Sequence, residues 1–156
     1  MPPTFTSATG VELYVADGIK GSNPCQLELL FTAEDIKSRI KQTYWQDSLY
    51  VLGALGKLVA LILQTNNLTG GIPASLGNIS SLGIFSVAYN NLVGSIPHEL
   101  GRLKSLTFLA IGPNNLFGTI PFPLYNMSSM STFSIAFNQI NGTLPSNIGL
   151  MLPNLK

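Results

Sequence analysis

The stretch LTFLAIGPNNLFGTIPFPLYNMSS, residues 106–129, recurs along the chain at a fixed spacing. Residues 58–81 and residues 82–105 align with it at a period of 24 residues. A fourth copy, residues 130–154, has 25 residues, with the extra one near positions 150–152. Repetition at such a period predicts a solenoid, in which each copy forms one turn and neighbouring turns bury a shared core.

Every copy has the same order of apolar, carboxamide, glycine and proline positions. Three apolar residues come first, and in residues 106–129 they are Leu106, Leu109 and Ile111. An asparagine follows three residues later, and after it come an apolar residue, a glycine and a proline. We expect the glycine to form a turn with positive φ, because it has no Cβ, and the proline to lie outside a central strand. The glycines are Gly70, Gly94, Gly118 and Gly142, and the prolines are Pro73, Pro97, Pro121 and Pro145.

The apolar pattern L-x-x-L-x-L-x-x-N is the leucine-rich-repeat signature, with one short strand in each turn. Its last two apolar residues are two positions apart, so both point to the core side of the strand. The asparagine stands where the chain leaves the strand, and an inward carboxamide can pair with buried backbone N–H and C=O groups there. We therefore predict a ladder of four stacked asparagines, Asn66, Asn90, Asn114 and Asn138.

The sequence N-N-L-x-G-x-I-P identifies the class of repeat more narrowly. It is complete at residues 90–97 and 114–121, and residues 66–73 have the same form. This motif resembles the plant-specific class of leucine-rich repeats, found in receptor-like kinase ectodomains, receptor-like proteins and polygalacturonase inhibitors. The resemblance covers residues 52–156. It implies a β-rich α/β repeat fold, a right-handed solenoid of about four turns of 24 residues each.

Residues 1–51 do not match the repeat and form a separate N-terminal segment in this interpretation. Thr32 is a candidate helix N-cap, and the apolar spacing after it predicts one helix over residues 33–46. We expect this helix to cover the first repeat as a substitute cap, because a bare solenoid end exposes core side chains. The repeat domain is predicted to span residues 52–156.

The composition excludes several classes of function. The chain has 156 residues, of which 46% are hydrophobic and 10% charged, and its formal net charge is +1. Residues 58–156 hold only three Lys or Arg and one Asp or Glu. The chain has no basic stripe to contact phosphates, which argues against a nucleic-acid partner. No apolar run reaches the ~20 residues of a membrane span, and the first residues do not have the pattern of a signal peptide.

The chain offers few side chains for catalysis or metal binding. Cys25 is the only cysteine, His98 is the only histidine, and Glu99 is the only acidic residue of the repeats. These residues cannot form a carboxylate pair, a nucleophile with its base, or a multi-cysteine metal site. We interpret Glu34 and Asp35 as favourable charge at a helix start. The sequence therefore predicts a protein that is not an enzyme and has no cofactor or metal.

The outward positions of the strands predict where a partner binds. In a solenoid these positions line the concave face, which is the usual binding surface. None of them is charged, and several are aromatic or aliphatic, which suits a protein or peptide better than a sugar or an ion. The candidate ligand face consists of Ile62, Gln64, Ile84, Ser86, Tyr89, Phe108, Thr132 and Phe137.

Four N-x-S/T sequons lie in connecting segments, outside the asparagine ladder. Such sequences accept N-linked glycans when a protein is secreted. The candidate glycosylation sites are Asn67, Asn78, Asn126 and Asn141.

The resemblance implies a recognition fragment similar to part of a plant receptor-like kinase ectodomain. Such a protein perceives a protein or peptide ligand in signalling or defence, and a co-receptor is a further expected partner. A complete relative would add a membrane span and a Ser/Thr kinase domain, so the resemblance implies an extracellular or plasma-membrane location. The alternative is a stand-alone inhibitor of a secreted cell-wall hydrolase, similar to the polygalacturonase inhibitors. Those inhibitors have two end caps and a charged or polar concave face.

Overall fold

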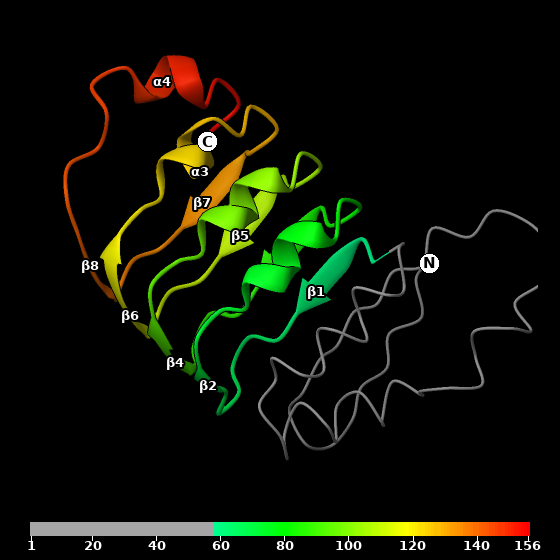
Figure 1. The fold of residues 1–156 in the computed structure, drawn as a ribbon, viewed down its shortest axis with the longest axis vertical. Coiled ribbons are helices and arrows are strands. Elements are labelled where there is room, and N and C mark those ends of the chain that lie inside the picture. Colours follow the sequence, from blue (N-terminus) through cyan, green and yellow to red (C-terminus); the bar gives the residue numbers. More distant parts are fainter. Residues whose placement is uncertain (1–57) are drawn as a thin grey trace, which may run out of the picture.

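The computed structural model describes residues 58–156, and these residues form a coil of four turns (Figure 1). The predicted helix over residues 33–46, its proposed capping role and Cys25 lie outside the described residues. Each turn contains one strand of a first sheet, one strand of a second sheet and one helical segment. The repeat pattern of the sequence therefore corresponds to one structural unit per turn.

The first sheet is parallel and has the strand order β1-β3-β5-β7. Its register pairs residues that are 24 positions apart, such as Ile84 with Phe108. This register confirms the predicted solenoid, because each strand lies beside the same strand of the next turn. The strands are β1 (Ala60–Ile62), β3 (Ile84–Ser86), β5 (Phe108–Ala110) and β7 (Thr132–Ser134).

The second sheet is also parallel and was not predicted from the sequence. Its register pairs residues 22 positions apart, such as Thr69 with Asn91, so it is shifted by two residues relative to the repeat. The repeat glycines lie in or beside this sheet with positive φ, 83° at Gly70 and 85° at Gly118, as predicted. The strands, in the order β2-β4-β6-β8, are β2 (Thr69–Gly70), β4 (Asn91–Gly94), β6 (Asn115–Thr119) and β8 (Gln139–Asn141).

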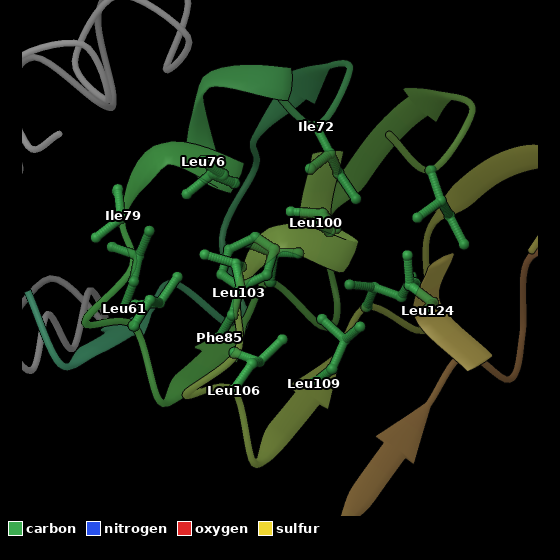
Figure 2. Close-up of a cluster of buried hydrophobic side chains, with 14 of the residues drawn as sticks. Leu61, Ile72, Leu76, Ile79, Phe85, Leu100, Leu103, Leu106, Leu109 and Leu124 are labelled. Atoms are coloured by element: carbon green, nitrogen blue, oxygen red, sulfur yellow. The ribbon is translucent and has the colours of Figure 1, made fainter. Parts of the chain in front are cut away.

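The apolar repeat positions fill the space inside the coil. Leu61, Phe85 and Leu109 come from three successive strands of the first sheet, and all three side chains are fully buried (Figure 2). Leu76 and Leu100 reach the same core from the helical segments. Each turn therefore buries its side chains against those of the next turn, which it could not do alone.

The asparagine ladder joins each turn to the one before it. The Asn114 Nδ2 donates to the carbonyl oxygen of Ile111 in its own turn, at 2.8 Å, and to that of Val87 in the preceding turn, at 2.9 Å. Its Oδ1 accepts the backbone N–H of Leu92 at 2.9 Å. Equivalent bonds join Asn90 to Leu63, Val87 and Leu68, and Asn138 to Ile111, Ile135 and Leu116.

Within residues 58–156, the carboxamide of Asn66, the first rung of this ladder, bonds to carbonyl oxygens of its own turn. The Asn66 Nδ2 donates to the carbonyl oxygens of Leu63 and Gln64, both at 3.0 Å. Asn90 and Asn114 are each 8% exposed, and they lie between turns. A buried carboxamide that pairs with three backbone groups prevents the desolvation penalty that those groups would otherwise have.

The first three helical segments pack closely along the side of the coil that carries neither sheet (Figure 1). A Cβ added to Gly77 would lie only 2.3 Å from the backbone oxygen of Glu99 in the next turn. Gly101, one repeat later, is similarly close to Pro123. Glycine at this repeat position therefore sets the spacing between helical segments. The segments are η1 (Ala74–Asn78), η2 (His98–Arg102), α3 (Phe122–Tyr125) and α4 (Ile148–Met151).

The third turn has Tyr125 at the position of these glycines. The tyrosine is 6% exposed, and its burial raises the pKa of the phenol above the usual value of 10.0. A ring at this position needs space that Gly77 and Gly101 leave to the neighbouring turn. The Tyr125 ring packs edge-on against the ring of Phe122 in the same helical segment, with the ring centroids 6.4 Å apart.

The fourth turn covers its core less completely than the others. Phe133 and Ile135 are only partly buried, whereas Leu109 and Ile111 at the same positions of the third turn are fully buried. The backbone N–H of Lys156 donates to the carbonyl oxygen of Ser131 at 2.9 Å, which repeats the contact between Ser131 and Thr107 one turn earlier. The chain therefore enters a further turn in the same register.

The close approach at Gly77 predicts a position-dependent cost of adding a methyl group. Gly77→Ala should lower the free energy of unfolding by about 1–3 kcal/mol, because the clash is with backbone and requires the turns to separate. Gly149→Ala is the matched control, since Gly149 has the same repeat position in the fourth turn and no atom within 4 Å of an added Cβ. Urea unfolding of the full chain measures both. Equal losses would contradict the proposed spacing role.

The ladder predicts a difference between two adjacent asparagines. Asn114→Ala should lower the free energy of unfolding by about 1–3 kcal/mol, because the N–H of Leu92 and two carbonyls would be left buried and unpaired. Asn115 is exposed, and Asn115→Ala should change the free energy far less. Thermal or urea unfolding provides the comparison, and similar effects at the two positions would show that the ladder does not hold the turns together.

Candidate ligand face

The ladder fixes the direction of the residue that precedes each asparagine. Thr65, Tyr89 and Phe137 have φ values of 59°, 57° and 58°, in the left-handed region that residues other than glycine seldom adopt. The Asn90 Nδ2 donates to the carbonyl oxygens of Val87 and Ala88, which holds the backbone just before Tyr89. This turn points the side chain away from the core.

Aromatic rings consequently stand out from the surface at this repeat position. Tyr89 is 64% exposed and Phe137 is 81% exposed. Between them the third turn has Pro113, which follows a cis Gly112–Pro113 peptide. A column of ring-bearing side chains therefore runs across three neighbouring turns, at the edge of the first sheet.

A second column lies on the strands themselves. Ile84, Phe108 and Thr132 are in register on β3, β5 and β7, and neighbouring parallel strands are about 4.8 Å apart. Phe108 is 36% exposed, whereas Ile84 and Thr132 are half-buried. The structure thus brings apolar and aromatic side chains from three turns to one surface.

The remaining predicted face residues come from the first two turns, and they differ in exposure. Gln64 is exposed and Ile62 is half-buried, but Ser86 is only 2% exposed. Ser86 therefore offers little surface to a ligand. Its hydroxyl donates to the Oε1 of Gln64 at 3.3 Å.

Among the described residues, most charged side chains lie on or beside the helical segment η2, and Lys156 is the exception. Glu99 and Arg102 are on η2, Lys104 follows it, and Lys156 ends the chain. His98 is exposed on η2, with its Nε2 3.4 Å from the Oε1 of Glu99. The residues of the candidate ligand face carry no formal charge themselves, but Lys156 lies next to the face, since its N–H donates to the carbonyl oxygen of Ser131, the neighbour of Thr132.

The four sequons are exposed and lie on two sides of the coil. Asn78 ends η1 and Asn126 caps α3, so both are on the helical side. Asn141 ends β8 in the second sheet. Asn67 precedes β2, and its Oδ1 accepts a hydrogen bond from the Nδ2 of Asn91 at 2.7 Å. All four side chains are thus accessible for modification.

The second sheet carries an exposed apolar surface that the sequence pattern does not predict. Val93 is 46% exposed and Phe117 is 53% exposed, on the adjacent strands β4 and β6. The sequence pattern predicts only one strand per turn, so it does not indicate that Val93 and Phe117 lie in a sheet. The repeat does relate these two residues to each other, because each stands two residues after the second asparagine of an N-N pair.

Within residues 58–156, no group of three or more His, Cys, Asp or Glu side chains is placed to hold a metal ion. No helix among the same residues is both long and apolar enough to cross a lipid bilayer.

Comparisons with known proteins agree with the repeat geometry. A family model described as Leucine Rich Repeat matches residues 57–79. No curated protein matches the chain by sequence. Solved structures match it over about two thirds of its length.

One similar structure is that of a TDR receptor, with 36% sequence identity and a TM-score of 0.64. The match covers 67% of this chain and 18% of that chain. The ectodomain of the receptor kinase GASSHO1/SCHENGEN3 from Arabidopsis thaliana, solved with Casparian strip integrity factor 2, is 46% identical, with a TM-score of 0.63. It matches 67% of this chain and 12% of its own.

The Arabidopsis receptor kinase HAESA, solved with the peptide hormone IDA and the co-receptor SERK1, is 31% identical with a TM-score of 0.60. The match covers 67% of this chain and 17% of that chain. The chain therefore spans less than a fifth of each of these three structures. Together with the repeat motif and the two parallel sheets, the matches show that the chain consists, in its described part, of plant-type leucine-rich repeats and resembles a fragment of a receptor-kinase ectodomain.

Proposed function

We propose that this chain recognises a protein or peptide ligand through the candidate ligand face, as an extracellular recognition module and not as an enzyme. The observation that carries the proposal is the exposure of Tyr89, Phe108 and Phe137 on neighbouring turns, on a surface without formal charge. Exposed aromatic side chains that cluster together provide most of the binding energy in many protein interfaces.

The spacing of the two columns suits an extended ligand. Side chains at equivalent positions of successive turns are about 4.8 Å apart, so a chain that crosses the turns would contact one residue of each turn in sequence. It would pass Ile84, Phe108 and Thr132 on one side and Tyr89, Pro113 and Phe137 on the other. Several rings would then be covered by one ligand.

The solved relatives support the same class of partner. HAESA binds a peptide hormone and a co-receptor, and PEPR1 was solved with AtPEP1. The structure of BIR3 with SERK2 adds a complex between two proteins. By analogy, we propose a peptide or protein ligand for this chain, with a co-receptor as a further partner and an extracellular or plasma-membrane location.

The alternative function, inhibition of a secreted cell-wall hydrolase, has less support. The resemblance to polygalacturonase inhibitors implies a charged or polar concave face. The candidate ligand face instead presents rings and aliphatic side chains, and the charges of the described residues lie on η2, beside it and at Lys156.

The proposal predicts which substitutions weaken binding. Peptides selected from a random display library against the full chain should lose about 1–2 kcal/mol of affinity with Phe108→Ala. Tyr89→Asn should have a similar effect, and asparagine is chosen because it tolerates the left-handed backbone at this position. Titration calorimetry measures the affinities, and circular dichroism checks that each variant is folded.

Substitutions on the helical side are the controls for this experiment. His98→Ala and Phe122→Ala alter exposed side chains of η2 and α3 and should leave peptide affinity unchanged. If Phe108→Ala and Tyr89→Asn leave peptide binding intact but His98→Ala abolishes it, the ligand binds the helical side and the proposal is wrong.

The absence of charge from the candidate ligand face also predicts the response to salt. The affinity of selected peptides should change by less than about threefold between low and high ionic strength, because no ion pair is screened. A steep fall in affinity with added salt would show that contact is made near Arg102 and Lys104 instead.

A further inference from the structure

A hollow of different chemistry lies beside the candidate ligand face, where the chain passes from the first sheet to the second. Its volume is about 400 Å³, within the range of small-molecule sites. The lining contains five carboxamides and two rings and has no charged side chain. The lining residues are Asn66, Tyr89, Asn90, Asn91, Pro113, Asn114 and Asn115.

The carboxamides of this hollow divide into two groups. Asn66, Asn90 and Asn114 belong to the ladder, and the Nδ2 of each donates to backbone carbonyl oxygens. Within the described part of the chain, the carboxamide of Asn115 has no hydrogen-bond partner, and neither has the hydroxyl of Tyr89. The Nδ2 of Asn91 donates to Asn67 and retains a second N–H. The hollow therefore offers neutral donors and acceptors.

The rings supply an apolar surface next to these polar groups. Tyr89 is 64% exposed, and Pro113 stands at the same repeat position of the next turn. Carboxamides that both donate and accept suit hydroxyl groups, which do the same, and an aromatic face suits a layer of C–H bonds. A pyranose sugar combines these two features. A charged ligand would find no opposite charge in the hollow.

We propose that this hollow binds a neutral pyranose sugar, with its hydroxyls on Asn91 and Asn115 and its C–H face on the ring of Tyr89. The proposal does not depend on peptide recognition. The sugar has two possible sources, a free oligosaccharide or an N-glycan on Asn67, whose carboxamide contacts Asn91. The two sources share one chemistry and are separated by the test.

The first arm uses the full chain without glycans, produced in bacteria and labelled with ¹⁵N. Chitotriose and cellotriose are the neutral probes, and trigalacturonic acid is the charged comparator. The side-chain amide signals of Asn91 and Asn115 should shift saturably with a neutral probe and not with the acid. Asn115→Ala and Tyr89→Asn should each weaken this binding at least about fivefold, the equivalent of one hydrogen bond or ring contact.

Two controls separate this site from the rest of the surface. Gln139 is exposed at the repeat position of Asn115, one turn further on, and it does not line the hollow. Gln139→Ala should leave sugar binding unchanged. Phe108→Ala should weaken the binding of peptides but not of sugars. Failure of this proposal and failure of the proposed peptide function therefore give different results.

The second arm uses the full chain secreted from yeast, with and without the sequon at Asn67. Thr69→Val removes the sequon but keeps the Asn67 carboxamide and its bond to Asn91. If the Asn67 glycan fills the hollow, a free trisaccharide should bind the Thr69→Val variant more tightly than the glycosylated chain. Equal binding would assign the hollow to a free oligosaccharide.

The proposal is overturned if neither a trisaccharide nor the Asn67 glycan shifts the Asn115 side-chain signal. It is equally overturned if sugar binding persists at full strength in both Asn115→Ala and Tyr89→Asn, because the sugar would then bind at another surface.

Discussion

The hydrogen bonds of the inward asparagines are the constraint on which the rest of the coil depends. Each carboxamide from Asn90 onward contacts backbone groups of two turns, so it fixes both the bend at the strand end and the register of its own turn against the preceding one. The same bonds hold the preceding residue at positive φ, as at Tyr89. A structural feature of the buried interior thereby determines which side chains the surface presents.

The first sheet and the ladder could be predicted because their signals are local and repeated. Apolar residues two positions apart define the core side of a strand. An asparagine that follows the strand into the interior is expected to form hydrogen bonds with buried backbone groups. The second sheet could not be predicted, because residues such as Thr69 and Asn91 show no apolar alternation. Its pairing is also shifted by two residues relative to the repeat, so alignment of the copies does not show it.

The candidate ligand face was only partly predictable for a similar reason. The repeat shows which residues point outward, but it does not show how exposed each one is, and Ser86 is only 2% exposed, with its hydroxyl bonded to Gln64 of the preceding turn. The direction of the Tyr89 side chain follows from its left-handed backbone. Bulky residues seldom adopt this conformation, so the sequence does not predict it. The spacing role of Gly77 likewise depends on a contact between turns, which the sequence does not show.

Native-state hydrogen exchange of the Leu92 amide tests the central role of the ladder most directly. This N–H donates to the Oδ1 of Asn114, in the next turn, and not to a backbone carbonyl. If the ladder holds the turns together, Leu92 should exchange as slowly as the Leu109 amide in the core of the first sheet, through opening of the whole coil. Exchange of Leu92 as fast as that of an exposed loop amide would contradict the account.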